Sequence, residues 1–417
     1  MAGHLLEAAS TGDAAQLAGL DKAAAELVSS GLQAAARLAV RALELTHPGD
    51  VGEVSRSVAA AEALTAAGRF SRAARMVEDG LAQPLPPVAE ARLRCALSSI
   101  LCGGGQPERA RGQAEAALAQ PRLPAEVRDV ALMAQLQALA GGPEADAADR
   151  IAAGILAGPN QHSRQVVASA LVTRALIAWD AGQVSDGLEL LHEAGRGGGG
   201  VSADARHVQP LLVLAAMLAD LGRWDKAEQV LRAIDRRGLR GIPAYAVLSV
   251  LDARLYLARG SLSQAAAAAQ QAVTAAGEAS SYAALGRCLV ALIALRQGDL
   301  TAAAQNLSGQ PAPVPYPAAI YARSAASMIH AQAAEACAGP AAAVRHIREI
   351  CAVLPARPGV LLGEPGIPAW LVRTTLAAGE HSLAADVTRA VDVLARDNPG
   401  VPRCYRQRGA QPRLASR

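Results

Sequence analysis

The sequence contains residue types that can do chemistry, but not at the spacings that catalysis requires. A phosphate-binding loop needs glycines followed directly by a lysine and a hydroxyl residue. The run Gly197–Gly200 is followed by Val201 and Ser202 with no lysine nearby, so a plain loop is the better interpretation. The motifs GxSxG, HExxH and HxE…CxxC, which mark nucleophilic or zinc-dependent catalysis, are absent from the sequence. We therefore predict no catalytic residue, no cofactor-binding residue and no metal ligand, and expect a protein that is not an enzyme.

Cysteine and histidine are scattered along the chain. The six cysteines form no CxxC pair, which argues against a zinc site or a disulfide framework and favours buried free thiols in a reducing cytoplasm. The eight histidines are interpreted as ordinary surface or packing residues. His192 and His330 fall within helical segments, and His346 and His381 flank corners. Carboxylates are distributed as on any solvated helix face.

Composition favours closely packed helices. About 100 of the 417 residues are alanine, 52% are apolar and only 2% are aromatic. Strands favour β-branched and aromatic residues, so an all-β fold is a poor fit. An α/α-toroid that acts on sugars would need more aromatic platforms than this chain offers. Trp224 and Phe70 are interpreted as packing residues, and Trp179 either as an inter-repeat packing residue or as a wall of a groove.

Charge and hydropathy limit the classes of partner. Forty basic residues against 37 acidic ones give a net charge of +3, which is less basic than a general nucleic-acid binder. Glu7 interrupts the stretch where a signal peptide would need apolar residues. The longest apolar runs, such as Leu211–Ala219, are shorter than the roughly 18 residues that span a bilayer. We expect a cytoplasmic protein with no membrane partner.

The strongest signal is an internal repeat. Each copy has a glycine, an apolar residue two positions later and a small residue five positions later. Successive glycines are 37 to 41 residues apart, which predicts about ten units. The glycines are Gly31, Gly68, Gly105, Gly142, Gly182, Gly222, Gly260, Gly298, Gly339 and Gly379. We name each unit after its glycine.

Each unit predicts two helices joined at a corner. The glycine supplies the positive φ that ends the first helix, and the apolar residue two positions later fills the corner. The small residue five positions later lets the second helix approach the first. A second small residue precedes the glycine by seven positions in seven units, and we expect these two small positions to face each other where the helices cross. The seven residues are Ala24, Ala61, Ser98, Ala175, Ala215, Ala253 and Ala291.

This pattern resembles the tetratricopeptide repeat, although its period exceeds 34 residues. The match is good in the Gly68, Gly222, Gly260 and Gly298 units and poor in the Gly339 unit, where Gln332 and Glu335 occupy inner positions of the first helix. The predicted fold is all-α: a right-handed superhelical solenoid of tetratricopeptide-like helix pairs. Each unit contacts only its neighbours, and the first helices line a concave groove.

The predicted organisation is one array and a tail. Residues 1–398 form the repeat array of about ten units, with a hinge at the glycine-rich segment 195–200. Residues 399–417 form an arginine-rich tail, interpreted as disordered and alternatively as a contact for a phosphate backbone. Its arginines are Arg403, Arg406, Arg408, Arg413 and Arg417.

A more specific resemblance is to the helical-repeat region of the large ATP-binding LuxR-type transcriptional regulators. The segment His4–Asp13 is similar to the junction between that family's ATPase and its repeats. Ala39–Leu45 with Pro48 is similar to its first repeat pair, and Ala61–Phe70 with Leu81–Pro87 to its second. Gly379–Asn398 is similar to its last repeat. Family members carry a P-loop ATPase before the repeats and a helix-turn-helix after them. This sequence contains neither, so no ATP or DNA function is carried onto its residues.

Two function hypotheses follow. The first is a non-catalytic sensor or scaffold region of a LuxR-type transcriptional regulator, which binds a protein partner or small-molecule effector in its groove. DNA would be reached only through the missing helix-turn-helix part, so the chain is a truncated remnant or acts in trans. The alternative is a free-standing tetratricopeptide-like adaptor for protein–protein interaction.

Overall fold

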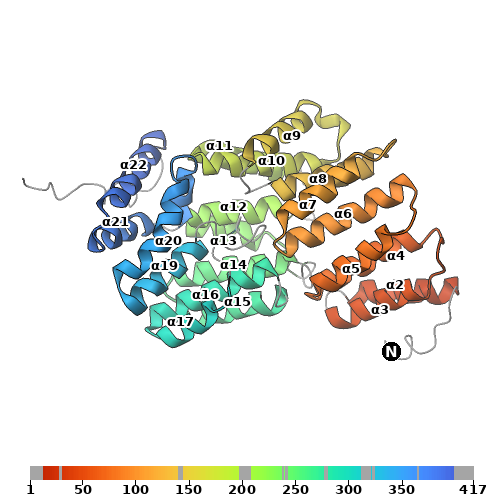
Figure 1. Ribbon diagram of the computed structural model, residues 1–417, viewed down its shortest axis with the longest axis horizontal. Helices are drawn as coiled ribbons and strands as arrows, with labels where there is room; N and C mark the ends of the chain where they lie inside the picture. Colours follow the sequence, from red (N-terminus) through yellow and green to blue (C-terminus); the bar gives the residue numbers. More distant parts are fainter. Residues whose placement is uncertain are drawn as a thin grey trace, which may run out of the picture.

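The structure is a computed structural model. It describes residues 13–27, 31–139, 144–196, 208–236, 239, 243–276, 280–310, 321, 325–363 and 366–398. Within these ranges every regular element is a helix, and the helices stack side by side into a curved array (Figure 1). The predicted tail at 399–417 and the glycines at 197–200 of the predicted hinge lie outside the described residues. Residues 195 and 196 belong to the end of a helix.

The helices form ten consecutive pairs, one around each predicted glycine. The first helices are α2 (Ala14–Leu27), α4 (Glu53–Ala66), α6 (Pro87–Gly103), α8 (Ala125–Leu139), α10 (Arg164–Asp180), α12 (Gln209–Asp220), α14 (Pro243–Ala258), α16 (Ser281–Gln297), α19 (Ala325–Ala338) and α21 (Ile367–Ala377). The second helices are α3 (Leu32–Glu44), α5 (Phe70–Leu81), α7 (Pro107–Leu118), α9 (Ala145–Ala157), α11 (Val184–Arg196), α13 (Trp224–Arg232), α15 (Leu262–Ala276), α17 (Leu300–Leu307), α20 (Pro340–Val353) and α22 (His381–Asp397). Two short 3₁₀ helices are η1 (Pro159–Gln161) and η3 (Pro358–Gly363).

Most of the predicted corner glycines adopt the expected backbone. Eight of them have φ between +69° and +84°. This left-handed conformation suits glycine because it has no Cβ. Gly31 is an exception: its φ is −157° and it precedes α3 instead of ending α2. The expected corner conformation is therefore wrong at Gly31, and Gly142 lies outside the described residues.

The two small positions do meet where paired helices cross. The Ser98 hydroxyl on α6 donates a 2.8 Å hydrogen bond to the carbonyl oxygen of Ala110 on α7. In the Gly182 unit, a Cβ added to Gly187 on α11 would lie 3.1 Å from the carbonyl oxygen of Ala175 on α10. All seven predicted positions before the glycine are buried. The close helix contact is thus made through residues that have almost no side chain at the crossing point.

In two units the second small position is shifted by one residue. The prediction placed it at Ala147 and Val344, but these are half-buried, whereas Ala148 and Ala343 are buried. The shift arises because the second helix of these two units starts at a different distance from the glycine. A second helix usually begins two residues after the glycine, but α9 begins at Ala145 and α20 at Pro340. The buried residue lies three positions after the helix start in both units, so it follows the helix and not the glycine.

The expectation that each unit contacts only its neighbours is wrong, because the C-terminal units pack against the Gly182 unit. The Arg357 guanidinium after α20 donates a 2.6 Å hydrogen bond to Asp180 on α10. The Asn398 amide after α22 donates to the Gly182 carbonyl and accepts from the Val184 amide. At Gly359 on η3, an added Cβ would collide with the Trp179 carbonyl oxygen. The helices from α10 to α22 therefore close into a ring.

Candidate binding groove

The first helices line a groove on the inner side of the array. The cavity has a volume of about 810 Å³. Its helical walls come from α4, α6 and α8 and from the N-terminal ends of α12, α14 and α16. Every one of these is the first helix of its pair, and Phe70 at the start of the second helix α5 adds one further side chain to the lining. The cavity is thus lined mainly by first helices, as predicted.

The wall formed by α4, α6 and α8 is mostly aliphatic. Small residues such as Ala61 and Ala96 leave space above the helix backbone. Val130 on α8 is 46% exposed, which is unusual for a large apolar side chain in this protein. Arg92 and Glu126 are exposed charged residues on the same wall. Such a surface binds apolar groups through burial and leaves a few polar groups to orient them.

The opposite wall carries aromatic residues. The rings of Tyr282 and Tyr321 have centroids 6.3 Å apart. Burial raises the pKa of both hydroxyl groups, so both remain protonated at neutral pH. On the wall of α4, α6 and α8, Phe70 at the start of α5 fills its corner with 8% exposure, as predicted, and also reaches the groove. A Cβ on Gly103 would lie 2.6 Å from the Phe70 ring, so Phe70 depends on the glycine of the neighbouring helix.

Two cysteines of α6 line the groove. Burial raises the pKa of the Cys95 and Cys102 thiols to about 12, so neither is a thiolate at neutral pH. Since the thiolate is the nucleophile, these thiols are unreactive in the folded state. Cys288 and Cys351 are also buried, as predicted, but Cys337 on α19 is exposed, which corrects the expectation of buried thiols at that position.

Two histidine pairings escaped the sequence analysis. The His330 and His346 rings, on α19 and α20, have centroids 5.9 Å apart. Burial lowers the pKa of both, and His346 adds to the effect on His330. His162 Nδ1 lies 2.8 Å from the Asp129 carboxylate, which also accepts from the Ser163 amide at 2.6 Å. Burial alone would raise the pKa of Asp129, but these hydrogen bonds lower it.

Neither arrangement forms a catalytic set or a metal site. The Asp129 carboxylate spans His162 and the residue that precedes α10, so it fixes the start of that helix. Among the residues that the structure describes, no three His, Cys, Asp or Glu side chains lie close enough to hold a metal ion. None of the helices in the described ranges has both the length and the apolar character to cross a bilayer.

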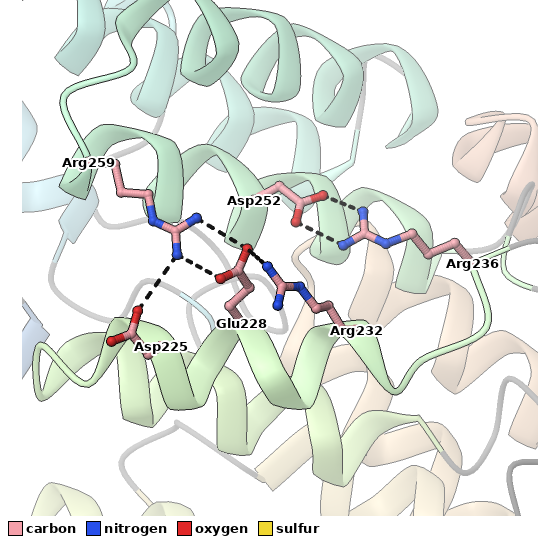
Figure 2. Close-up of polar contacts among 6 residues, drawn as sticks. All are labelled: Asp225, Glu228, Arg232, Arg236, Asp252 and Arg259. Atoms are coloured by element: carbon pink, nitrogen blue, oxygen red, sulfur yellow. Dashed lines mark hydrogen bonds and ion pairs between the residues drawn. The ribbon is translucent and has the colours of Figure 1, made fainter.

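Charged residues outside the groove connect neighbouring units. Between α13 and α14, Arg259 forms two hydrogen bonds to Glu228, of 2.6 and 3.1 Å, and lies 3.8 Å from Asp225 (Figure 2). The hydrogen bond from Arg259 lowers the pKa of Glu228. Arg236 pairs with Asp252 beside them. Because the arginine of each pair is exposed to solvent, each pair adds little stability, and the pairs represent the solvated helix faces expected from the sequence.

The poor match of the Gly339 unit has a packing explanation. Glu335 on α19 accepts a 2.6 Å hydrogen bond from the Trp370 indole and a 2.9 Å bond from the Thr374 hydroxyl, both on α21. The acidic residue therefore joins the first helices of the last two units. An apolar residue at this position would remove the acceptor that the Trp370 indole and the Thr374 hydroxyl use.

Comparison with solved structures is informative about the fold. The Rap protein complexed with Competence and Sporulation Factor matches with a TM-score of 0.52 over 83% of this chain and 99% of its own, at 14% identity. The fold is a tetratricopeptide-like helical repeat. A tetratricopeptide repeat protein from Parabacteroides merdae (TM-score 0.35, 13% identity, 76% of this chain and 98% of its own) is more distant. The human IFIT1 dimer with m7Gppp-AAAA matches at a TM-score of 0.43 and 15% identity over 95% of this chain and 100% of its own. No protein-family model and no curated protein sequence matches the chain.

Proposed function

We propose that this chain is a non-catalytic, cytoplasmic binding module whose concave groove holds a protein partner or a small-molecule effector. The observation that carries the proposal is the groove itself. It is lined mainly by the first helices of six units and exposes apolar side chains such as Val130 that no described element covers. The thiols within it are protonated, which favours binding over covalent chemistry.

Within that role, we propose that the module is the sensor region of a LuxR-type transcriptional regulator. The support is the resemblance of its first two repeat pairs and of Gly379–Asn398 to the repeats of that family. In such a regulator, effector binding in the groove would be passed to an ATPase and a helix-turn-helix outside the residues printed here. The alternative is a free-standing adaptor for protein–protein interaction, which the tetratricopeptide-like fold equally supports. In either case we propose residues 1–398 as one repeat array.

Photo-crosslinking from inside the groove tests the binding role. A benzophenone amino acid replaces Val130 in one variant and Val51 in another, and each is expressed in the native cell. Both valines are exposed, but Val51 lies in the loop before α4 and does not line the groove. We expect crosslinked adducts from position 130 that are missing from position 51. Identical adduct patterns at both positions would show that the groove is not the contact surface.

The size of the native product separates the regulator from the adaptor. An antibody against this chain would detect the product by immunoblot in the native cell. The regulator predicts a band well above the 42.5 kDa calculated for these residues. A single band near that mass contradicts a regulator that carries the ATPase and helix-turn-helix in the same chain, and leaves the adaptor or a sensor that acts in trans.

A further inference from the structure

The ring of helices holds a second cavity that shares no lining residue with the groove. Its volume is about 370 Å³. It lies at the C-terminal ends of α14 and α16, whereas the groove lies at their N-terminal ends. This volume is within the roughly 300–1,000 Å³ typical of small-molecule sites.

Tryptophan is concentrated at this cavity. The chain has three tryptophans, and Trp179 is fully buried in the core. The other two, Trp224 at the start of α13 and Trp370 on α21, are half-buried and line the cavity. Trp224 therefore does more than fill the corner to which the sequence assigned it. Leu289 and Met328 complete a largely apolar wall, which suits a flat aromatic body.

The cavity also has one buried hydrogen-bond donor group, the guanidinium of Arg254, whose side chain is 7% exposed. Its Nη1 donates to the Tyr321 carbonyl at 2.9 Å. Its Nη2 donates to Asp220 and, at 3.2 Å, to the Gly363 carbonyl. A guanidinium has five N–H donors, so the Nε–H and one Nη1–H are not used by these three acceptors.

These contacts fix the guanidinium before any ligand arrives. Asp220 neutralises most of its charge, so an incoming oxygen atom needs to accept a hydrogen bond but does not need to be anionic. A ligand oxygen beside the guanidinium can accept from these remaining N–H groups, which forms a charge-assisted hydrogen bond. The rigid position of Arg254 reduces the entropy lost on binding.

We propose that this cavity binds a small molecule that combines a flat aromatic body with a carbonyl or carboxylate oxygen. The aromatic body packs against Trp224 and Trp370, and the oxygen accepts a hydrogen bond from Arg254. This ligand would be separate from the occupant of the groove, so the site is independent of the proposed function.

Calorimetric titration with three matched probes tests the ligand class. The probes are 2-acetylnaphthalene, 2-naphthoate and 2-ethylnaphthalene, which share one aromatic body and differ in the oxygen acceptor. We expect 2-acetylnaphthalene or 2-naphthoate to bind at least tenfold more tightly than 2-ethylnaphthalene, and the tighter of the two shows whether the ligand is a ketone or an acid. Equal binding of all three, or binding of none, overturns the proposal.

Two variants then locate the binding site. Ala258→Trp fills the cavity from an exposed position at the end of α14, and Ala96→Trp fills the groove instead. We expect Ala258→Trp to lower the affinity for the tighter probe at least tenfold and Ala96→Trp to leave it unchanged. Gln332→Phe, at a half-buried cavity position, is the second filling variant if circular dichroism shows that Ala258→Trp is misfolded. Unchanged affinity in a folded cavity variant overturns the assignment.

Discussion

The side-chain amide of Asn398 donates a 2.6 Å hydrogen bond to the carbonyl oxygen of Gly182, although 216 residues separate the two in sequence. Its amide oxygen accepts a 3.1 Å bond from the Val184 backbone amide. Asn398 thus occupies the corner of the Gly182 unit and ties the last helix to it. This contact, with the Arg357–Asp180 pair, converts the second half of an open array into a ring.

Replacing Asn398 should therefore loosen the ring. Asn398→Ala removes the two hydrogen bonds to the corner, and the Val184 amide and Gly182 carbonyl keep only their mutual 3.1 Å bond. At about 0.5–1.5 kcal/mol for each lost bond, we expect a loss of about 1–3 kcal/mol in the free energy of unfolding. Urea denaturation measures it. Asn306→Ala is the control, because Asn306 donates only to Ala302 within its own helix. A loss no larger than that of the control would show that the ring is not held at this point.

The buried pair of Asp220 and Arg254 should be far more sensitive than an exposed pair. Asp220→Ala leaves the guanidinium of Arg254 in the interior without its counter-ion, which typically costs about 3–5 kcal/mol. Asp252→Ala removes the partner of Arg236. This pair is less buried, with 45% of the Arg236 side chain and 19% of the Asp252 side chain exposed, so the change should cost about 0–1 kcal/mol. Thermal and urea unfolding of both variants give the comparison. Similar losses in the two would contradict the burial argument.

The helix crossing of the Gly182 unit should have no space for one added methyl group. Gly187→Ala places a Cβ 3.1 Å from the Ala175 carbonyl, so we expect destabilisation of about 1–3 kcal/mol from overpacking. Gly112→Ala is the matched control on another second helix, where an added Cβ meets nothing within 4 Å. Because alanine lowers the conformational entropy of the unfolded chain, Gly112→Ala should stabilise the protein by about 0.4–1 kcal/mol. Urea unfolding that gives both variants the same sign would refute the close crossing.

Stability should fall in mild acid because of the His330–His346 pair. Burial lowers the pKa of both residues in the folded state, so the unfolded chain binds more protons as the pH falls below the ordinary histidine value of about 6.5. The stability present above that pH is lost as the pH decreases toward the folded pKa values. His330→Gln should reduce the fall in unfolding free energy between pH 7.5 and 5.5, and His192→Gln, at an exposed position, should not. An unchanged pH dependence in His330→Gln would refute this account.

The fold was predictable because its constraints are local. Positive φ at glycine and a small residue at a helix crossing act within one unit, so their periodic spacing reveals both, as at Gly105 with Ser98 and Ala110. The one-residue shifts at Ala148 and Ala343 were not predictable from the glycines, because they depend on where the second helix begins.

The ring and the second cavity could not be predicted in this way. The partners Asn398 and Gly182 lie far apart in sequence and occur once, so no period marks them. The same is true of Arg254, whose acceptors come from three separate parts of the chain. The groove was predictable as a surface of first helices, but its aromatic wall was not, because only Tyr282 and Tyr321 of neighbouring units form it and no other unit repeats the pair.

The central claim is that a partner or effector binds on the concave side of the first helices. The most direct test is to measure, by calorimetry, the affinity of the molecule captured from position 130 for three forms of the protein. These are the unmodified chain, Ala96→Trp inside the groove and Ala153→Trp, an exposed position on the second helix α9. We predict that Ala96→Trp weakens binding at least tenfold and that Ala153→Trp has no effect. Equal affinity for all three would contradict the claim.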